Sequence, residues 1–361
     1  MIRLGIIGCG LMGKTHANNI LEGKIPGATL TAISDTDQAA RDWAKEKGLQ
    51  AFTTSTALMD SGTVDAIIVA TPHYDHPIIA MEAMDKNIHV LIEKPAGVFT
   101  KNVREMNKKA AKSDVVFAIM YQHRTNPIYQ KMREMIQNGE LGELKRTSWI
   151  ITDWYRSQFY YDMGGWRATW KGEGGGVLIN QCPHNLDLWQ WICGMPTKIT
   201  AFAHNGKWHD IEVEDDVTAY VEYANGATGT FVTTTADCPG TNRFEITGDL
   251  GKLVYENDEL VHYKLEMSER EFNRVNKIAF GFPKAERIVI DCSKDVSFHN
   301  GVLAAFVDKI NGKGELFAKG EEGINGLTIS NAMHLSSWIG KTVELPLDED
   351  LFLAELTKRF V

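Results

Sequence analysis

A glycine-rich turn near the start of the chain is the feature that most narrows the possible folds. Gly8-Cys9-Gly10-Leu11-Met12-Gly13 has the spacing GxGxxG, follows an apolar run from Arg3 to Ile7 and precedes a helix-compatible stretch. Between a strand and a helix, such glycines permit a tight turn, close approach of a pyrophosphate to the backbone, and close helix packing. Free N–H groups at the helix start then hold phosphate charge. The pattern predicts a dinucleotide-binding βαβ unit, with cofactor contacts from Gly8, Gly10, Leu11, Met12 and Gly13.

An acidic residue follows the second predicted strand. Leu30 to Ser34 is the expected strand, and Asp35 comes next, 22 residues beyond Gly13. A carboxylate at this strand end accepts hydrogen bonds from the adenosine ribose and repels a 2′-phosphate. The next arginine is Arg41, so the usual cationic partner for NADP is missing. We therefore expect NAD as the cofactor, with NADP less favoured; the alternative is a plain glycine turn with Asp35 as a helix cap.

The pattern of the first 120 or so residues predicts a parallel sheet. Short apolar runs alternate with helix-compatible stretches, as βαβ units require. Besides Leu30–Ser34, the expected strands are Arg3–Ile7, Ala66–Ala70, His89–Ile92 and Val115–Met120, and the expected helices include Gln38–Lys47 and Pro77–Lys86.

The pattern changes after about residue 125. A predicted helix at Ile128–Asn138 precedes longer strands, and Asn225-Gly226 between two of them, 217–223 and 227–235, is a strong hairpin signal. A second hairpin is expected around Gly248 to Gly251, and helices return at 300–310 and 326–339. We expect an α/β protein: an N-terminal Rossmann doubly wound parallel sheet over residues 1–123, then an α+β domain with a large open, mainly antiparallel sheet over residues 124–361.

Composition excludes several classes of partner. A net charge of −9 argues against a surface that neutralises nucleic-acid phosphates. No stretch approaches the roughly 18 apolar residues of a membrane span, and the first residues form an apolar strand pattern without a charged leader. The five cysteines are odd in number and show neither CxxC pairs nor zinc spacing. We expect no metal site, no nucleic-acid or membrane partner, and a reducing cytoplasm.

Three further motifs identify a family. Ala70-Thr71-Pro72-His73-Tyr74-Asp75-His76 and Glu93-Lys94-Pro95 follow successive strands, and residues 174–187 have the sequence GGGVLINQCPHNLD. With the glycine turn, they resemble the glucose-fructose oxidoreductase and inositol dehydrogenase family (Gfo/Idh/MocA) over nearly the whole chain, as far as 343–347. The resemblance implies oxidation or reduction of one secondary hydroxyl of a sugar, sugar derivative or cyclitol. It also implies a homodimer or homotetramer formed through the open sheet.

The resemblance implies that Lys94 and His184 are the catalytic pair, and both residue types suit the chemistry. Removing hydride from a carbinol carbon requires the hydroxyl proton to leave, and an imidazole can accept it. A lysine held before a proline at a strand end can stabilise developing alkoxide charge. Asn180 stands four residues before His184, a same-face helix spacing, where the commonest family pattern has Asp. Either the proton path needs no carboxylate there, or Asp187, three residues after His184, supplies it.

A stretch dense in aromatics and arginine, residues 154–170, is expected to line the site. Flat rings stack on sugar faces, and arginine donates to hydroxyls or carboxylates; the alternative is core or interface packing. The resemblance implies cofactor contacts from Trp166 and Arg167. The other expected cofactor residues are Thr71, Pro72, His73, His76, Glu93, Lys94 and Gln122. The expected substrate residues are His123, Arg124, Trp154, Arg156, Asn180 and Asp187.

These features together predict an NAD-dependent dehydrogenase acting on a sugar, glycoside or cyclitol by hydride transfer to the nicotinamide, with a 3-keto sugar as one candidate product. One alternative is an NAD-assisted glycosidase with transient oxidation, which would form no net NADH. Another is a non-catalytic NAD-binding sugar sensor, against which the presence of both Lys94 and His184 speaks.

Overall fold

The computed structural model describes residues 1–293 and 295–360, and these divide into two compact units. The first unit contains residues 1–125, 172–174 and 297–328, and the second contains most of the remainder. The first crossing, after Thr125, lies close to the expected division at residue 123. The first unit is nevertheless discontinuous in sequence, because it takes more than thirty residues from near the end of the chain. In the described part of the chain, no helix has the length and apolar character needed to cross a membrane.

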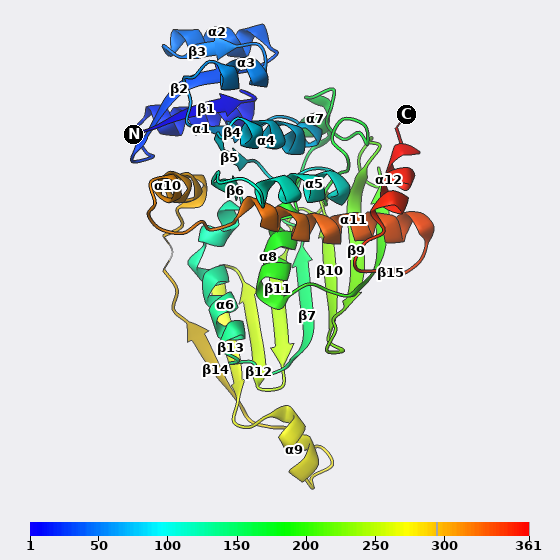
Figure 1. The fold of residues 1–361 in the computed structure, drawn as a ribbon. Coiled ribbons are helices and arrows are strands. Elements are labelled where there is room, and N and C mark those ends of the chain that lie inside the picture. Colours follow the sequence, from blue (N-terminus) through cyan, green and yellow to red (C-terminus); the bar gives the residue numbers. More distant parts are fainter. Residues whose placement is uncertain (294, 361) are drawn as a thin grey trace. The chain divides into compact units, whose positions relative to one another are not determined.

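The first unit is built on a six-stranded parallel sheet in the order β3-β2-β1-β4-β5-β6. This confirms the doubly wound Rossmann architecture (Figure 1). Its strands are β1 (Ile2–Ile7), β2 (Ala28–Ser34), β3 (Gln50–Phe52), β4 (Ala66–Val69), β5 (His89–Ile92) and β6 (Phe117–Ile119). Its helices are α1 (Leu11–Leu21), α2 (Gln38–Glu46), α3 (Ser55–Asp60), η1 (His73–Asp75), α4 (His76–Asp85), α5 (Thr100–Ala110), η2 (Gln122–Thr125), α10 (Phe298–Ile310) and η3 (Gly320–Glu322).

The core of this unit explains both its strand pattern and its discontinuity. All four residues of β4 are buried, as expected for a parallel strand covered on both faces. Phe306 and Leu303 of α10 are completely buried in the same cluster as Leu4 and Ile33 of the sheet. A helix from near the end of the chain therefore completes the Rossmann core.

The second unit is built on a nine-stranded sheet in the order β14-β13-β12-β11-β7-β10-β9-β8-β15. Its strands are β7 (Leu144–Ile151), β8 (Lys198–Asn205), β9 (Glu214–Glu222), β10 (Thr228–Thr234), β11 (Asn242–Gly248), β12 (Gly251–Glu256), β13 (Glu259–Leu265), β14 (Ala285–Ile290) and β15 (Val343–Glu344). Its helices are α6 (Pro127–Gln137), α7 (Gln158–Asp162), α8 (Pro183–Cys193), α9 (Glu269–Val275) and α12 (Glu349–Thr357), while α11 (Gly323–Ile339) runs from the first unit into the second.

Most neighbouring strands of this sheet are antiparallel, and both predicted hairpins are confirmed. β7 and β10 form a parallel pair in the middle of the sheet. At the first hairpin, Gly226 has a φ of 84°, and the Asn225 side chain accepts a hydrogen bond from the Ala227 N–H at 3.0 Å. The short-range turn chemistry thus fixes the register of β9 against β10.

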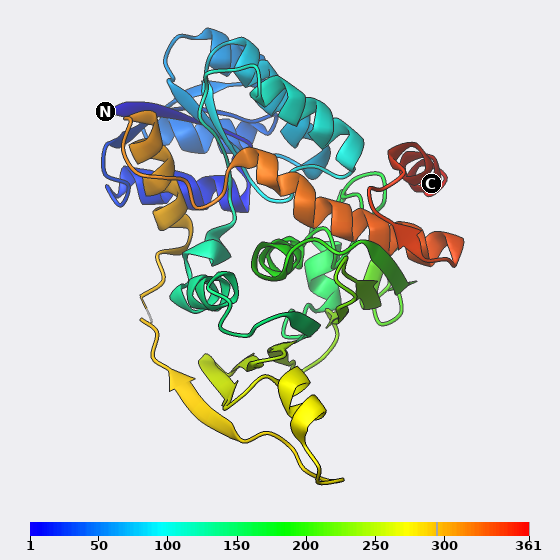
Figure 2. The same cartoon turned by 60° about the horizontal axis from the view of Figure 1, so that its bottom comes forward.

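The two faces of the large sheet differ. On one face, Trp149 of β7 stacks on Phe244 of β11 with ring centroids 4.2 Å apart, and Trp189 of α8 stacks on Phe231 of β10. Figure 2 shows α6 and α8 on this same side of the sheet. Alternate residues point to the opposite face, where Ile150, Phe202 and Tyr220 are exposed. The sheet is therefore covered on one face and open on the other.

Candidate active site

The three glycines of the motif, of which Gly8 and Gly10 precede α1 and Gly13 lies in its first turn, are needed for two different structural reasons. At Gly8, whose φ is +87°, an added Cβ would lie 2.6 Å from the carbonyl oxygen of Ala70, and at Gly13 it would lie 2.0 Å from that of Gly8. At Gly10 an added Cβ would meet no atom within 4 Å. Gly10 is also the N-cap of α1 and provides no side-chain hydrogen bond to the helix. Gly8 and Gly13 are thus required by internal packing, whereas Gly10 leaves space beside a helix start that suits a pyrophosphate.

Asp35 lies at the end of β2 beside this turn. Its carboxylate accepts hydrogen bonds from the N–H of Cys9 at 2.6 Å and from the N–H of Asp37 at 2.8 Å. The carboxylate therefore holds the glycine turn against β2. Arg41 donates to the carbonyl oxygen of Asp35 at 2.7 Å, so a guanidinium does reach this strand end, although its contact is with the backbone.

The loop after β4 contains four of the expected cofactor residues: Thr71, Pro72, His73 and His76. The ring nitrogens of His76 lie 2.8 Å from the carbonyl oxygen of Pro95 and 2.9 Å from that of Thr71, so His76 joins the loops after β4 and β5. His73 is buried, with Nδ1 3.0 Å from the carbonyl oxygen of Glu173. The Thr71 hydroxyl oxygen is buried and has no hydrogen-bond partner among the described residues. A ligand could satisfy this orphan group, and the loop therefore fits a cofactor.

Glu93 and Lys94 follow β5, and histidines surround them. Glu93 Oε1 lies 2.7 Å from Nε2 of the buried His16, and the other carboxylate oxygen accepts the Lys94 N–H at 3.2 Å. Burial alone would raise the pKa of Glu93, but the His16 contact and the positive charge of Lys94 outweigh it and hold that pKa below its usual value. Burial lowers the pKa of His123 to about 4, and the neighbouring His299 and Lys94 lower it further.

The segment η2 after β6 contains Gln122, His123 and Arg124, which sequence reasoning placed near the cofactor and substrate. Gln122 and Arg124 are buried, and His123 is partly exposed. The Arg124 guanidinium donates to Glu322 at 2.5 Å and to the carbonyl oxygen of Phe317 at 3.2 Å. Arg124 thus fastens η2 to the segment around η3, and substrate binding by Arg124 remains a prediction.

In the second unit, a buried glutamate shapes the glycine-rich loop before α8. Glu214, fully buried at the start of β9, accepts hydrogen bonds from the N–H groups of Gly176 at 2.9 Å and Leu178 at 3.0 Å. His334 Nε2 lies 3.1 Å from the same carboxylate. A Cβ at Gly176 would lie 1.9 Å from the carbonyl oxygen of Glu214, which accounts for this glycine. Glu214 therefore fixes the path of the chain into α8.

His184 and Asp187 both lie in the first turns of α8 and are buried. The expectation that Asn180 and His184 share a helix face is wrong. α8 begins at Pro183, and Asn180 belongs to the preceding turns, where its N–H donates to the carbonyl oxygen of Gly176. Proline favours the first helical position, which places the helix start after Asn180. The Asp187 carboxylate accepts a hydrogen bond from Gln190 at 3.1 Å.

A tyrosine that sequence reasoning missed joins two of the expected site residues. The Tyr160 hydroxyl accepts hydrogen bonds from the guanidinium of Arg167 at 2.9 Å and the amide of Asn180 at 3.3 Å. The Arg167 guanidinium also lies over the ring of Trp166, 4.8 Å from its centroid. The aromatic-rich loop and the turn before α8 are therefore connected within the second unit.

The start of the aromatic-rich loop is held by a buried Asp–His pair. His209 Nδ1 lies 2.9 Å from Oδ2 of the fully buried Asp215, and His209 Nε2 lies 2.9 Å from the carbonyl oxygen of Arg156. Trp154 donates from its indole to Asn185 of α8 at 3.2 Å. Of the two expected substrate residues, Trp154 is thus held through its indole ring and Arg156 through its backbone carbonyl group.

The residues that sequence reasoning missed are mostly partners of the expected ones. They are His16, Tyr160, His209, Glu214, Asp215, His299 and His334. One signal was available: Glu214-Asp215 is a pair of acids just before the predicted strand 217–223, where a carboxylate that becomes buried requires a partner. His16 gave a weaker signal as a histidine within the first turns of α1.

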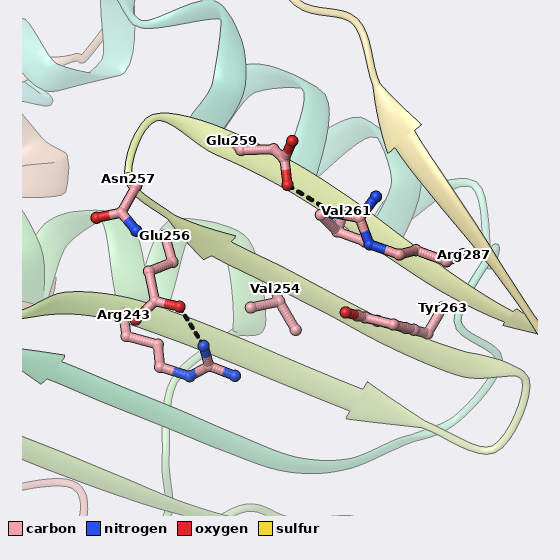
Figure 3. Close-up of a pocket in the computed structure, with 8 residues that line it drawn as sticks. All are labelled: Arg243, Val254, Glu256, Asn257, Glu259, Val261, Tyr263 and Arg287. Atoms are coloured by element: carbon pink, nitrogen blue, oxygen red, sulfur yellow. Dashed lines mark hydrogen bonds and ion pairs between the residues drawn. The ribbon is translucent and has the colours of Figure 1, made fainter.

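A shallow hollow on the large sheet contains none of the expected site residues. Figure 3 shows it between β11 and β14, and two ion pairs cross it, Arg243–Glu256 and Arg287–Glu259. The remaining residues that line it are Val254, Asn257, Val261 and Tyr263. Its polar, partly exposed lining differs from the buried surroundings of Glu93 and Glu214.

Two family models match the chain. The model for the oxidoreductase family, NAD-binding Rossmann fold, matches residues 2–121. The model for the GFO/IDH/MocA C-terminal domain matches residues 129–254. The two matches correspond to the parallel sheet of the first unit and to much of the large sheet of the second.

Named proteins and solved structures are similar to the chain. The scyllo-inositol 2-dehydrogenase (NAD(+)) of Bacillus subtilis is 25% identical over 63% of this chain and 66% of that protein. The D-glucoside 3-dehydrogenase of Escherichia coli is 29% identical over 62% and 68%. The first curated relatives are matched over less than two thirds of their own length. The WlbA dehydrogenase from Chromobacterium violaceum, solved with NADH and UDP-GlcNAcA, superposes with a TM-score of 0.81 at 27% identity, over 96% of each chain.

The glycine turn gives a matched pair of variants. Gly10→Ala is expected to weaken NADH binding by about tenfold or more without loss of stability, because the methyl group enters space that the pyrophosphate needs. Gly13→Ala is expected to cost about 1–3 kcal/mol of unfolding free energy through overpacking against Gly8. Protein fluorescence on NADH titration and urea unfolding measure the two quantities. Wild-type NADH affinity in Gly10→Ala would contradict the placement of the cofactor.

The charge of Asp35 gives a second prediction. Asp35→Asn keeps the shape but removes the charge, and we expect the preference for NAD over NADP to fall by about tenfold, the size of one charged hydrogen bond. Dissociation constants for both cofactors, measured by fluorescence, test this expectation. Asp37→Asn is the control, since Asp37 is exposed and caps α2. An unchanged ratio in Asp35→Asn would remove Asp35 from cofactor selection.

Proposed function

Because the chain belongs to the Gfo/Idh/MocA family of oxidoreductases, we propose that it is an NAD-dependent dehydrogenase that oxidises one secondary hydroxyl of a sugar, a glycoside or a cyclitol. The observation that carries the proposal is the dinucleotide turn of the first unit. Its open space at Gly10 and the carboxylate of Asp35 suit NAD, and Lys94 follows a strand of the same sheet. Ligands of open α/β sheets bind at the carboxyl ends of the strands.

The proposed chemistry assigns separate tasks to two residues. His184, at the start of α8, takes the proton from the reacting hydroxyl as a general base. Lys94 donates a hydrogen bond to the same oxygen and stabilises the negative charge that develops there. NAD, held by the glycine turn and Asp35, would supply the hydride acceptor for this reaction. Asp187 is the carboxylate proposed to assist His184, because it lies three residues further along α8, whereas Asn180 precedes the helix.

Relatives narrow the substrate class without fixing the substrate. The named relatives act, by their names, on an inositol and on position 3 of a D-glucoside, and the WlbA structure contains a UDP-linked sugar acid. The aromatic-rich loop with Trp154, Arg156 and Trp166 suits a ring with hydroxyls or a carboxylate. We propose a pyranoside or cyclitol substrate, with a 3-keto sugar as the product where the substrate is a glucoside.

The first test is NADH formation with a substrate panel. NAD and the protein are incubated with myo-inositol, scyllo-inositol, aryl glucosides, free hexoses and UDP-GlcNAcA, and NADH absorbance is followed. We expect sustained NADH formation with one class, reduced at least about 100-fold by Lys94→Ala and by His184→Ala, the usual contribution of a proton-transfer group. Urea unfolding of both variants shows whether they remain folded.

The controls use residues of the same type at the surface. Lys112→Ala and His204→Ala change exposed side chains and are expected to retain wild-type rates. Cleavage of aryl glucosides without net NADH would instead establish the NAD-assisted glycosidase. Sugar binding without either reaction, unaffected by Lys94→Ala and His184→Ala, would establish the sensor.

We also propose that the chain forms homo-oligomers through the open face of the large sheet, in a reducing compartment such as the cytoplasm. Ile150, Phe202 and Tyr220 expose apolar surface on that face, and the Arg–Glu pairs of Figure 3 offer charges of both signs to a second copy. The five cysteines all lie among the described residues and none of them forms a disulfide there, as a reducing compartment favours.

Light scattering tests the assembly. The wild-type protein is expected to have the mass of a dimer or tetramer, and Phe202→Glu is expected to lower it because the change places a charge in an apolar contact. Ile78→Glu is the control, since Ile78 is 57% exposed against 63% for Phe202 but lies on α4 of the first unit. A wild-type mass of one chain would contradict the proposal.

A further inference from the structure

A buried histidine of α1 contacts the glutamate beside the proposed catalytic lysine. His16 is completely buried, and its Nε2 lies 2.7 Å from Oε1 of Glu93, which is 5% exposed. The two residues are far apart in sequence and come from different elements of the first unit, α1 and the end of β5. Neither residue is assigned a task in the proposed reaction.

The hydrogen-bond pattern fixes which partner is the donor. The other ring nitrogen of His16, Nδ1, is buried and has no hydrogen-bond partner among the described residues. A neutral imidazole carries one proton, and placing it on Nε2 lets the ring donate to the Glu93 carboxylate. A second proton on Nδ1 would have no acceptor in this environment. His16 therefore donates from Nε2, and the Glu93 carboxylate accepts.

The second oxygen of Glu93 acts on Lys94. It accepts the Lys94 N–H at 3.2 Å, so the carboxylate is held at one oxygen by His16 and contacts the lysine backbone with the other. The positive charge of Lys94 acts on Glu93 in turn. A carboxylate fixed by two contacts is a stable counter-charge for the ammonium group of the following residue.

Two histidines, His123 and His299, interact electrostatically with Lys94, and the pKa of each is lowered. His299 of α10 has its ring centroid 5.6 Å from that of His16, and burial lowers the pKa of His299. His123 of η2 has its pKa lowered to about 4, first by burial and then by His299 and Lys94. A histidine supplies no negative charge at neutral pH, whereas Glu93 is an acid whose pKa the charge of Lys94 helps to hold down.

We propose that His16 and Glu93 are positioning residues for Lys94: His16 fixes the Glu93 carboxylate, and Glu93 fixes the Lys94 backbone and keeps its side chain charged. The importance of this pair for catalysis rests on the proposed role of Lys94. Its effect on the charge of Lys94 is a property of the folded chain that can be measured without a substrate.

The first experiment measures the charge of Lys94 directly. Acetic anhydride modifies uncharged amines, and mass spectrometry of the Lys94 peptide against pH gives the midpoint of labelling, with the exposed Lys112 as internal reference. Glu93→Gln is expected to move the Lys94 midpoint down by about one pH unit, because a neighbouring negative charge is lost. His16→Leu is expected to move it in the same direction. His16→Gln, whose amide can donate in place of Nε2, is expected to stay near the wild type.

The second experiment applies the same variants to turnover. Glu93→Gln and His16→Leu are expected to lower kcat about tenfold, as the loss of an orienting partner does elsewhere. In His16→Leu, which changes none of the expected cofactor residues, the NADH dissociation constant is expected to change by less than about threefold because the glycine turn is intact. The alkaline limb of the kcat profile is expected to move to lower pH in Glu93→Gln. His16→Gln is expected to recover most of the rate.

The control and the opposing outcomes are defined by the same measurements. His262→Leu removes another buried histidine, on β13 of the second unit, and is expected to leave the Lys94 labelling midpoint and kcat unchanged. An unchanged Lys94 midpoint in Glu93→Gln overturns the inference, even if the melting temperature falls. The inference is also overturned if His16→Gln has the same Lys94 labelling midpoint and kcat as His16→Leu. If the wild type forms no NADH with any substrate, the proposed function fails, while the labelling result still decides whether the pair controls the charge of Lys94.

Discussion

The loops that carry the candidate catalytic residues depend on buried carboxylates, and a buried carboxylate is stable only where donors surround it. Glu93 is satisfied by His16 and the Lys94 backbone in the first unit. Glu214 is satisfied by the N–H groups of Gly176 and Leu178 in the second. Each glutamate therefore selects one path for the neighbouring chain, which places Lys94 at the end of β5 and starts α8 next to His184.

The sheets of the two units differ in which faces are covered, and this difference suits the tasks proposed for the two units. The parallel sheet of the first unit is covered on both faces, with α10 completing its core, and it presents a fixed turn to a cofactor. The large sheet of the second unit is covered by α6 and α8 on one face (Figure 2). Its other face exposes Phe202 and Tyr220. One surface is thus left for the site residues around α8, and another for the proposed contact with a second copy.

Whether a feature could be predicted from the sequence depends on how far apart in the sequence the interacting residues lie. Five of the six strands of the first unit, the hairpin at Asn225-Gly226 and the helix at 127–137 were predictable because each depends on residues close together in sequence. β3 was missed because it has three residues and no apolar run. Asn180 was placed on the wrong element because a period of four does not reveal that a helix starts only at Pro183.

By itself, the sequence determined the class of fold, the dinucleotide turn and the identity of Lys94 and His184 as candidates, because these are encoded in contiguous motifs. The tertiary structure decided which groups support them. His16 lies 77 positions from Glu93 in sequence and Glu214 lies 38 from Gly176, and no local pattern pairs such residues. Their contacts exist because folding removes water from the carboxylates, and only the assembled sheet and helices bring a donor close enough to replace it.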